Sequence, residues 1–228
     1  MSKYRFNSDQ YGIHSKILAE IGSNQKILEV GCASGYISKK LQKKGNIVTA
    51  VEIDPSEAKK ALRYCQKVYV GDIESKIIFR KIKKLRFNRI LLADVLEHFK
   101  NPEDTLLNLS NLLDKRGKII ISVPNIAFLT NRLSHLLGRF EYTDWGIMDK
   151  THLRFFTKQT ALDLIKKGGL KVVKFDYTGG FTQLPLFMKV IHPLIGEFNW
   201  FKKLEYHISG LWPEGLAFQF LFVCQKTA

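Results

Sequence analysis

Residues 26–38, KILEVGCASGYIS, constrain the fold of this chain more than any other stretch. The apolar run at 27–30 indicates a short buried strand, and a helical pattern resumes after Gly35. Small residues between the two elements let the backbone approach a ligand closely, and the free N–H groups of a first helical turn can bond polar ligand atoms. The stretch therefore predicts a nucleotide-binding corner, with an ordinary strand–turn–helix connection as the alternative.

Alternating strand and helix patterns follow this corner to the end of the chain. We expect further strands at 46–53, 68–71, 87–94, 117–123, 170–177 and 216–226. We expect helices at 9–21, 54–65, 75–86, 101–113, 126–137 and 158–167, a long irregular loop at 138–151, and no clear pattern at 180–214. Such alternation predicts an α/β fold with a parallel sheet that helices cover on both faces.

Polar residues stand where the expected strands end. They are Glu29, Glu52, Asp72, Asp94 and Asn125. In parallel sheets, ligands bind beyond the carboxyl ends of the strands, where the strand order switches. Glu52 or Asp72 alone could be a helix cap. The five residues together predict a shared ligand site along one edge of the sheet.

Three stretches resemble one enzyme family. The pattern E-x-G-x-x-x-G at 29–35, with Ala33 between the glycines, is similar to motif I of class I S-adenosylmethionine (SAM) methyltransferases. ILLADVLEHFKNPEDTLLNL, followed by IIISVPN, resembles the small-molecule branch of that superfamily, which includes ubiquinone- and menaquinone-biosynthesis-type and glycan-associated enzymes. DKTHLRFFT at 149–157 resembles a second signature of this branch. The resemblance covers residues 10–178.

The resemblance implies a Rossmann-like class I methyltransferase fold, with a mostly parallel seven-stranded sheet, helices on both faces and an antiparallel last strand. It implies SAM as cofactor and S-adenosylhomocysteine as product. Glu52 would bind the ribose hydroxyls, Asp72 the adenine amino group, and Asp94 would lie near the transferable methyl. The full implied cofactor set is Glu29, Gly31, Cys32, Ala33, Gly35, Tyr36, Glu52, Ile53, Asp72, Ile73, Asp94 and Val95.

Two histidines are candidate general bases, since a hydroxyl acceptor must lose a proton and imidazole titrates near neutrality. They are His98, which could instead orient the cofactor loop, and His152, which we expect at the rim of the site. In an extended segment Arg154 would share a face with His152 and could hold an anionic group. Residues 149–157 could alternatively be only a docking segment that closes the sheet edge. We expect no metal site.

The acceptor is less constrained than the cofactor. No [DN]-P-P-[FYW] or Pro-Cys motif marks a DNA-base enzyme, so we expect a small molecule, with O-methylation favoured and N- or C-methylation open. The net charge of +15, with seven basic residues and no acid at 76–89, leaves an RNA-modifying enzyme as an alternative, or simply a solvated face. A non-catalytic SAM-binding module is a third possibility.

We expect one methyltransferase domain over 1–228, with an N-terminal helix in 1–22, a substrate loop at 138–151 and a cap insertion at 180–214. Aromatic and basic residues in that insertion leave a lipid-linked or glycan-related acceptor and peripheral membrane contact open. Three cysteines without a closely spaced pair, no signal-peptide pattern in the first ten residues and no apolar run near 20 residues favour a cytoplasmic protein.

Overall fold

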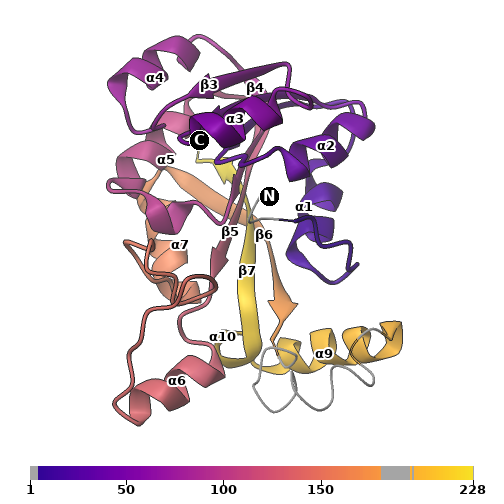
Figure 1. The fold of residues 1–228 in the computed structure, drawn as a ribbon, viewed down its shortest axis with the longest axis vertical. Helices are drawn as coiled ribbons and strands as arrows, with labels where there is room; N and C mark the ends of the chain where they lie inside the picture. Colours follow the sequence, from indigo (N-terminus) through magenta and orange to yellow (C-terminus); the bar gives the residue numbers. More distant parts are fainter. Residues whose placement is uncertain (1–4, 181–195, 197, 228) are drawn as a thin grey trace.

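A seven-stranded sheet runs through the part of the chain that the computed structural model describes, residues 5–180, 196 and 198–227 (Figure 1). Its strands are β1 (Lys26–Val30), β2 (Ile47–Glu52), β3 (Lys67–Val70), β4 (Phe87–Ala93), β5 (Leu113–Pro124), β6 (Leu170–Gly179) and β7 (Ala217–Lys226). Their order is β3-β2-β1-β4-β5-β7-β6. The first five strands pair in parallel, and β7 is antiparallel to β5 and β6. The predicted sheet is confirmed.

Helices pack on both faces of the sheet. One face is covered by α1 (Ile13–Ile21), α2 (Tyr36–Lys43) and α3 (Pro55–Ala61), and the other by α4 (Lys76–Ile82), α5 (Pro102–Ser110) and α7 (Lys158–Lys167). The apolar spacing of α1 explains its placement, because Ile13, Ile17 and Ile21 recur every four residues and are all buried. Three more helices, α6 (Leu129–Leu136), α9 (Asn199–Leu211) and α10 (Pro213–Leu216), lie toward the lower end in Figure 1.

Local capping sets where several helices begin. The carboxylate of Asp54 accepts from the N–H groups of Ser56 and Glu57, and Pro55 occupies the first helical position of α3. Thr157 forms a capping box with Thr160 at the start of α7. These polar caps are short-range signals, so the sequence locates these starts well.

Several helix bounds differ from expectation: α1 begins at Ile13 rather than residue 9, α4 ends at Ile82 rather than residue 86, and α3 and α5 also end early. Helix α3 ends at Ala61 rather than Cys65, since the chain turns there and Tyr64 N–H donates to the Ala61 carbonyl. Helix α5 ends at Ser110 rather than residue 113, and β5 begins at Leu113, which pairs with Phe87. The register then shifts around Gly117 before the regular ladder resumes. Pairing with β4 thus overrides the apolar helical pattern at this point.

The strand order switches between β1 and β4, which lie side by side although two strands, β2 and β3, separate them in sequence. The carboxyl ends of β1, β2, β3 and β4 therefore meet at one edge, where a parallel sheet binds its ligands. The cap predicted at 180–214 lies partly outside the described residues, as does the apolar helix face expected from Leu186, Val190, Ile191 and Leu194. Of that region the structure describes Gly180, residue 196, and 198 onward.

Candidate active site

The corner after β1 has the tight backbone that its small residues predict. Gly31, Ala33 and Gly35 all have positive φ angles, of 71°, 46° and 78°. A Cβ on Gly31 would lie 2.3 Å from Val95 Cγ1, and one on Gly35 would lie 3.0 Å from Ala61 Cα. These glycines are therefore needed because Val95, in the turn after β4, and α3 pack directly against the corner.

Glu52 ties this corner to the end of β2. Its Oε2 accepts from the Ala33 N–H at 2.7 Å, and its Oε1 accepts from the Asp54 N–H at 2.9 Å. Ala33 is thus held in its left-handed conformation by a bond to a carboxylate. Because a carboxylate has about four lone-pair sites, Glu52 keeps acceptor capacity for a ligand after making both bonds.

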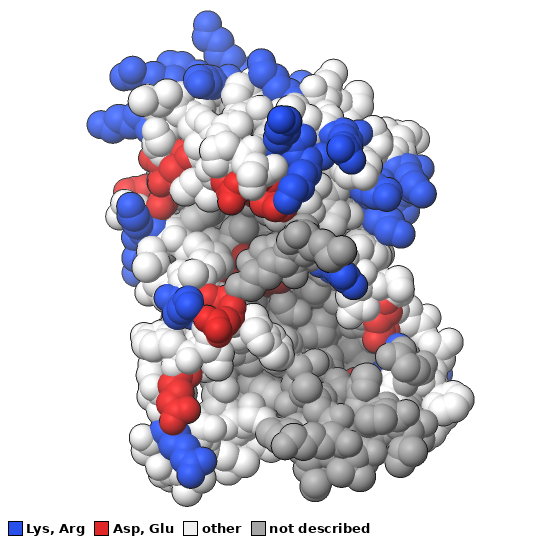
Figure 2. Space-filling model, viewed as in Figure 1, with Lys and Arg blue, Asp and Glu red and all other residues white. Residues whose placement is uncertain are grey.

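A cavity of about 1030 Å³ opens at the carboxyl edge of the sheet. That volume is at the upper end of the range for ligand sites, roughly 300–1,000 Å³. Of the residues singled out from the sequence, Gly31, Ala33, Tyr36, Glu52, Ile53, Asp72, Ile73, Asp94, Val95 and His98 line it. Figure 2 shows acidic side chains around the hollowed middle of this view, and most Lys and Arg side chains above it.

Three residues expected in the cofactor site do not line the cavity: Glu29, Cys32 and Gly35. Glu29 is 2% exposed and lies beneath the corner, where its Oε2 accepts from Ser38 Oγ at 2.5 Å. Burial raises the pKa of Glu29 to about 8, and the Ser38 hydrogen bond opposes part of that rise. Cys32 is also buried. These residues support the corner from below.

Asp94 marks the end of β4 and has a positive φ of 51°. Ser122 Oγ donates to its Oδ1 at 2.8 Å, and Gln219 Nε2 donates to its Oδ2 at 2.9 Å. Burial raises the pKa of Asp94, while these two donors lower it. The carboxyl group is thus fixed in orientation at the cavity wall by side chains from β5 and β7.

Glu97, His98 and His152 form a compact cluster beside Asp94. Glu97 and His98 come from a single 3₁₀ turn, η1 (Leu96–His98), and His152 comes from the loop before α7. The Nε2 atom of His152 lies 3.8 Å from Glu97 Oε1, and the two imidazole rings meet edge to face with centroids 4.9 Å apart. The sequence did not single out Glu97 as functional, although it is adjacent to His98.

His152 and Arg154 do not line the large cavity, so a direct role in catalysis for either stays a prediction. The side chain of His152 is only 7% exposed, and it does not line the large cavity. The guanidinium of Arg154 donates to the carbonyls of Phe99 and Lys100, each at 2.7 Å. These two bonds fasten residues 149–157 to the chain after η1, which fits the docking alternative for this segment. Only His98 of the three expected catalytic residues reaches the cavity wall.

Other lining residues come from the start of α1, which sequence reasoning did not connect to the site, and from the two segments predicted as substrate loop and cap. His14 and its neighbours at the start of α1, Trp145 from the 138–151 loop, and Lys202 and Glu205 from α9 all line the cavity. Burial lowers the pKa of His14 to about 4, so its ring is neutral. No sequence signal linked the start of α1 to the site, whereas the aromatic and basic residues of 180–214 predicted a cap there.

Sequence comparisons agree with this geometry. Residues 7–174 match a family model described as a methyltransferase domain. A ubiquinone biosynthesis O-methyltransferase from Rickettsia canadensis is 32% identical over 156 residues, which cover 66% of this chain and 64% of that protein. A protein of the same name from Coxiella burnetii is 29% identical over 181 residues, covering 76% and 70%. The chain thus spans less than two thirds of the Rickettsia relative.

Solved structures share the fold at low sequence identity. A putative methyltransferase bound to the Haloferax volcanii Trm112 activator has a TM-score of 0.65 at 16% identity, covering 96% of this chain and 91% of that one. A SAM-dependent methyltransferase from Archaeoglobus fulgidus has a TM-score of 0.62 at 14% identity, covering 94% and 95%. At such identities the similarity establishes the fold and not the reaction.

Proposed function

This chain belongs to the class I SAM-dependent methyltransferases, and from that premise we propose that it transfers the methyl group of SAM to a hydroxyl oxygen of a small molecule. The coarser activity, SAM-dependent methyl transfer, follows from the family. The hydroxyl acceptor is supported by relatives of about 30% identity that carry the name O-methyltransferase. The proposed reaction requires a site that holds SAM and an acceptor in one cavity.

The observation that carries the proposal is the convergence of strand-end acids on one cavity. Glu52, Asp72 and Asp94 follow three different strands, and all three line it. We assign Glu52 to the ribose hydroxyls and Asp72 to the adenine amino group, since carboxylates accept hydrogen bonds from both. The methionine part would then lie along Gly31, and the sulfonium would face the end of the cavity near Asp94.

Methyl transfer is an in-line displacement at the sulfonium methyl carbon. A lone pair of the acceptor oxygen forms the new C–O bond, the C–S bond breaks, and its electron pair stays on sulfur, which leaves S-adenosylhomocysteine. The chain mainly aligns the two reactants and excludes water. The acceptor hydroxyl also loses its proton, and we assign this step to the cluster around His98, the cluster's residue on the cavity wall.

The acceptor would enter past Trp145, Lys202 and Glu205, which line the cavity together with the strand-end residues. This supports roles for the 138–151 loop and the described part of 180–214 in substrate binding. A lipid-linked or glycan-related acceptor fits an entrance of this mixed apolar and charged character. None of the basic residues at 76–89 lines the cavity, so we do not propose RNA as the acceptor.

The test is incubation of the protein with methyl-labelled SAM and fractionated cell extract. We expect label in a small-molecule or lipid fraction, as an ether that resists mild base, whereas a methyl ester would be cleaved. Label in RNA, or in no fraction despite SAM binding, would contradict the proposal and favour one of the two alternatives.

The cofactor assignment has a separate test in Glu52→Ala. Loss of this carboxylate strands the N–H groups of Ala33 and Asp54 and removes the ribose acceptor. We expect SAM affinity to fall by about 1–3 kcal/mol in calorimetry. Asp163→Ala, at an exposed position of α7, is the matched control and should bind SAM like the wild type. Unchanged affinity in Glu52→Ala would remove Glu52 from the site.

A further inference from the structure

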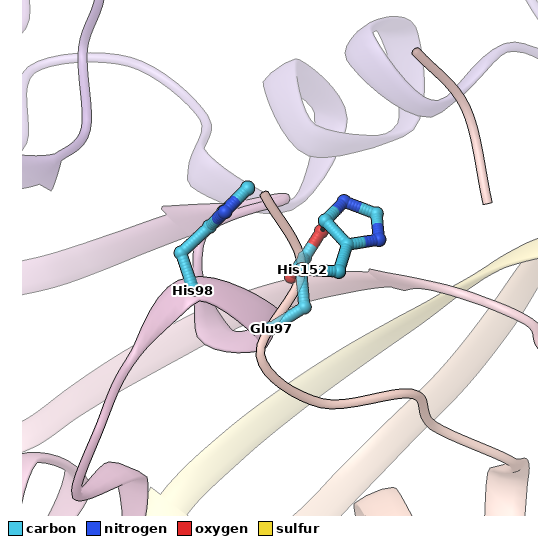
Figure 3. Close-up of side chains that lie close together, drawn as sticks. All are labelled: Glu97, His98 and His152. Carbon is cyan, nitrogen blue, oxygen red and sulfur yellow. Dashed lines mark ion pairs between the residues drawn. The ribbon is translucent and has the colours of Figure 1, made fainter. Parts of the chain in front are cut away.

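Glu97, His98 and His152 bring one oxygen and two nitrogen ligand atoms together just behind the cavity wall, which only His98 of the three reaches. One such atom from each residue lies within 4.8 Å of the others. Figure 3 shows the three side chains gathered between the turn after β4 and the loop that carries His152. Fifty-four positions separate the two histidines in sequence, so no short motif spacing reveals the set.

The hydrogen bonds of the two imidazoles fix their tautomers. Nδ1 of His98 lies 3.0 Å from the Thr151 carbonyl oxygen, and Nδ1 of His152 lies 3.0 Å from the Ile147 carbonyl oxygen. A carbonyl only accepts, so each Nδ1 carries the proton and each neutral ring keeps a lone pair on Nε2. Metal-binding histidines in proteins almost always have this arrangement, with the second ring nitrogen bonded to a carbonyl or carboxylate.

The carboxyl group of Glu97 is the member of the cluster whose hydrogen bonding is not accounted for. The residue is 1% exposed, and neither Oε1 nor Oε2 has a hydrogen-bond partner among the described residues. A buried carboxylate without a partner is costly, so the group must either keep a proton or face a cation. Asp94 and Asp149 add negative potential at this carboxyl group, which favours a cation here.

We propose that Glu97, His98 and His152 bind one divalent transition-metal ion of the zinc type. Two imidazoles and one carboxylate are a ligand set that zinc enzymes use, with a fourth position left open. Mg²⁺ and Ca²⁺ prefer oxygen ligands and fit this set poorly. The structure thus argues against the expectation, drawn from the sequence, that the chain has no metal site.

The metal site deepens the proposed function and, in this step, rests on it. His98 belongs both to the cluster and to the cavity wall, so a cation on this ring borders the space for the acceptor. An acceptor hydroxyl at the open position would lose its proton more readily, because the cation stabilises the resulting oxyanion. The proton passes to solvent or a nearby base, and the oxygen then attacks the methyl carbon. His152 would also fasten the 138–151 loop to the sheet through the metal.

The rival arrangement keeps Glu97 protonated. Its hydroxyl would then donate toward the His152 Nε2 lone pair, now 3.8 Å away, after a small movement. That arrangement satisfies the buried acid without any ion. The two cases differ in a direct measurement, since only one of them gives stoichiometric metal binding.

The experiment strips the full chain with a chelator and titrates it with Zn²⁺, Co²⁺ and Mg²⁺ in calorimetry, followed by absorption spectra of the Co²⁺ form. We expect one Zn²⁺ and one Co²⁺ per chain, visible Co²⁺ bands typical of a nitrogen–oxygen site, and no comparable Mg²⁺ binding. Glu97→Gln and His152→Ala should each weaken Zn²⁺ binding at least tenfold. His207→Ala, at an exposed position of α9, is the control and should leave binding unchanged.

Absence of a one-to-one Zn²⁺ complex in the wild type would overturn the proposal, as would unchanged affinity in both cluster variants. If a variant fails to fold, the wild-type Co²⁺ spectrum and stoichiometry still decide. Methyl transfer that chelation abolishes and Zn²⁺ restores would support the step through the acceptor hydroxyl, and activity unaffected by metal would overturn that step. A chain that binds Zn²⁺ through these residues but methylates no acceptor would support the site and contradict the proposed function.

Discussion

Three carboxyl groups beneath and beside the cavity are each held differently. Glu29 bonds to Ser38, Asp94 bonds to Ser122 and Gln219, and Glu97 has no bonded partner among the described residues. Burial raises the pKa of all three. The site therefore concentrates acids that are costly to ionise, a pattern typical of functional sites.

Glu29→Gln should change how stability depends on pH. The pKa of Glu29 is about 8 in the folded chain and near 4.5 when unfolded, so the folded state holds this proton more tightly. Its stabilising contribution is present below about pH 4.5 and is lost as pH rises through 8. We expect the melting temperature of Glu29→Gln, relative to the wild type, to increase between pH 5 and pH 9. Each pKa unit corresponds to about 1.4 kcal/mol.

Glu103→Gln is the matched control, since it removes only an exposed ion pair with Lys167. The melting temperature of Glu103→Gln should differ little from that of the wild type between pH 5 and pH 9, because exposed ion pairs contribute about 0–1 kcal/mol. A pH-independent difference for Glu29→Gln would mean that Glu29 is already ionised in the folded chain.

At the residue scale, the sequence predicted the acids at the cavity better than their partners. Glu52, Asp72 and Asp94 follow strands, and the carboxyl ends of parallel strands share an edge, so their convergence follows from the fold. Gln219 comes from the last strand, 125 positions after Asp94, and no pattern links the two. The bonds of Arg154 to two backbone carbonyls were equally invisible, since they depend on where two loops meet.

At the element scale, prediction succeeded where local signals act alone. Helix α7 runs from Lys158 to Lys167 as expected, with a capping box at its start and Gly168 after its end. It failed at the end of α5, because an apolar helical pattern continues to Leu113 while that residue pairs with Phe87. A strand partner distant in sequence decided that boundary, and single-sequence patterns do not contain it.

The segment before α1 is an element whose role the structure suggests. Arg5, Asn7 and His14 line the cavity, the ring of Phe6 stacks on His14 with centroids 5.2 Å apart, and Asn7 N–H donates to His14 Nδ1. Across the entrance, Lys202 of α9 lies 3.8 Å from Asp9. The segment therefore forms part of the cavity wall on the side of α1.

Deletion of residues 2–8 should weaken SAM binding without unfolding the chain. The deletion removes Arg5 and Asn7 from the cavity and the Phe6 ring from His14, whereas the buried isoleucines of α1 remain. We expect calorimetry to show a SAM affinity at least several-fold lower, because a closed wall excludes water from polar contacts. Replacement of the same residues by a Gly/Ser sequence of equal length is the control for chain length and should bind as weakly. Wild-type affinity in either variant would show that the segment is not part of the cofactor site.

At the scale of the whole molecule, charge and apolar surface gather at opposite ends. Lys and Arg side chains crowd the upper end in Figure 2, where α4 lies, and α6 and α9 lie at the lower end in Figure 1. Helix α6 has no buried residue, Leu136 and Leu137 are 82% and 71% exposed, and Leu211 at the end of α9 is 83% exposed. Among the described residues, no helix is long and apolar enough to cross a bilayer.

The apolar lower end should bind a lipid surface. Arg132 of α6 lies over the ring of Trp212, which follows α9, 5.3 Å from its centroid, so α6 contacts the end of α9. Exposed leucines beside a cation suit the interface of an anionic membrane, and the net charge of +15 adds long-range attraction. We therefore expect the chain to sediment with vesicles rich in anionic lipid and to stay largely in solution with neutral ones.

The double substitution Leu136→Ser and Leu137→Ser should reduce the vesicle-bound fraction several-fold, since burial of each leucine contributes about 1.5–3 kcal/mol. Leu62→Ser, at a site 55% exposed just after α3, is the matched control and should bind like the wild type. Salt distinguishes the two forces, because it screens the charge attraction but not the apolar contact. Binding that high salt abolishes would show that net charge alone holds the chain to lipid. Equal weakening by Leu62→Ser and by the double variant would show that the lower end is not the lipid-binding surface.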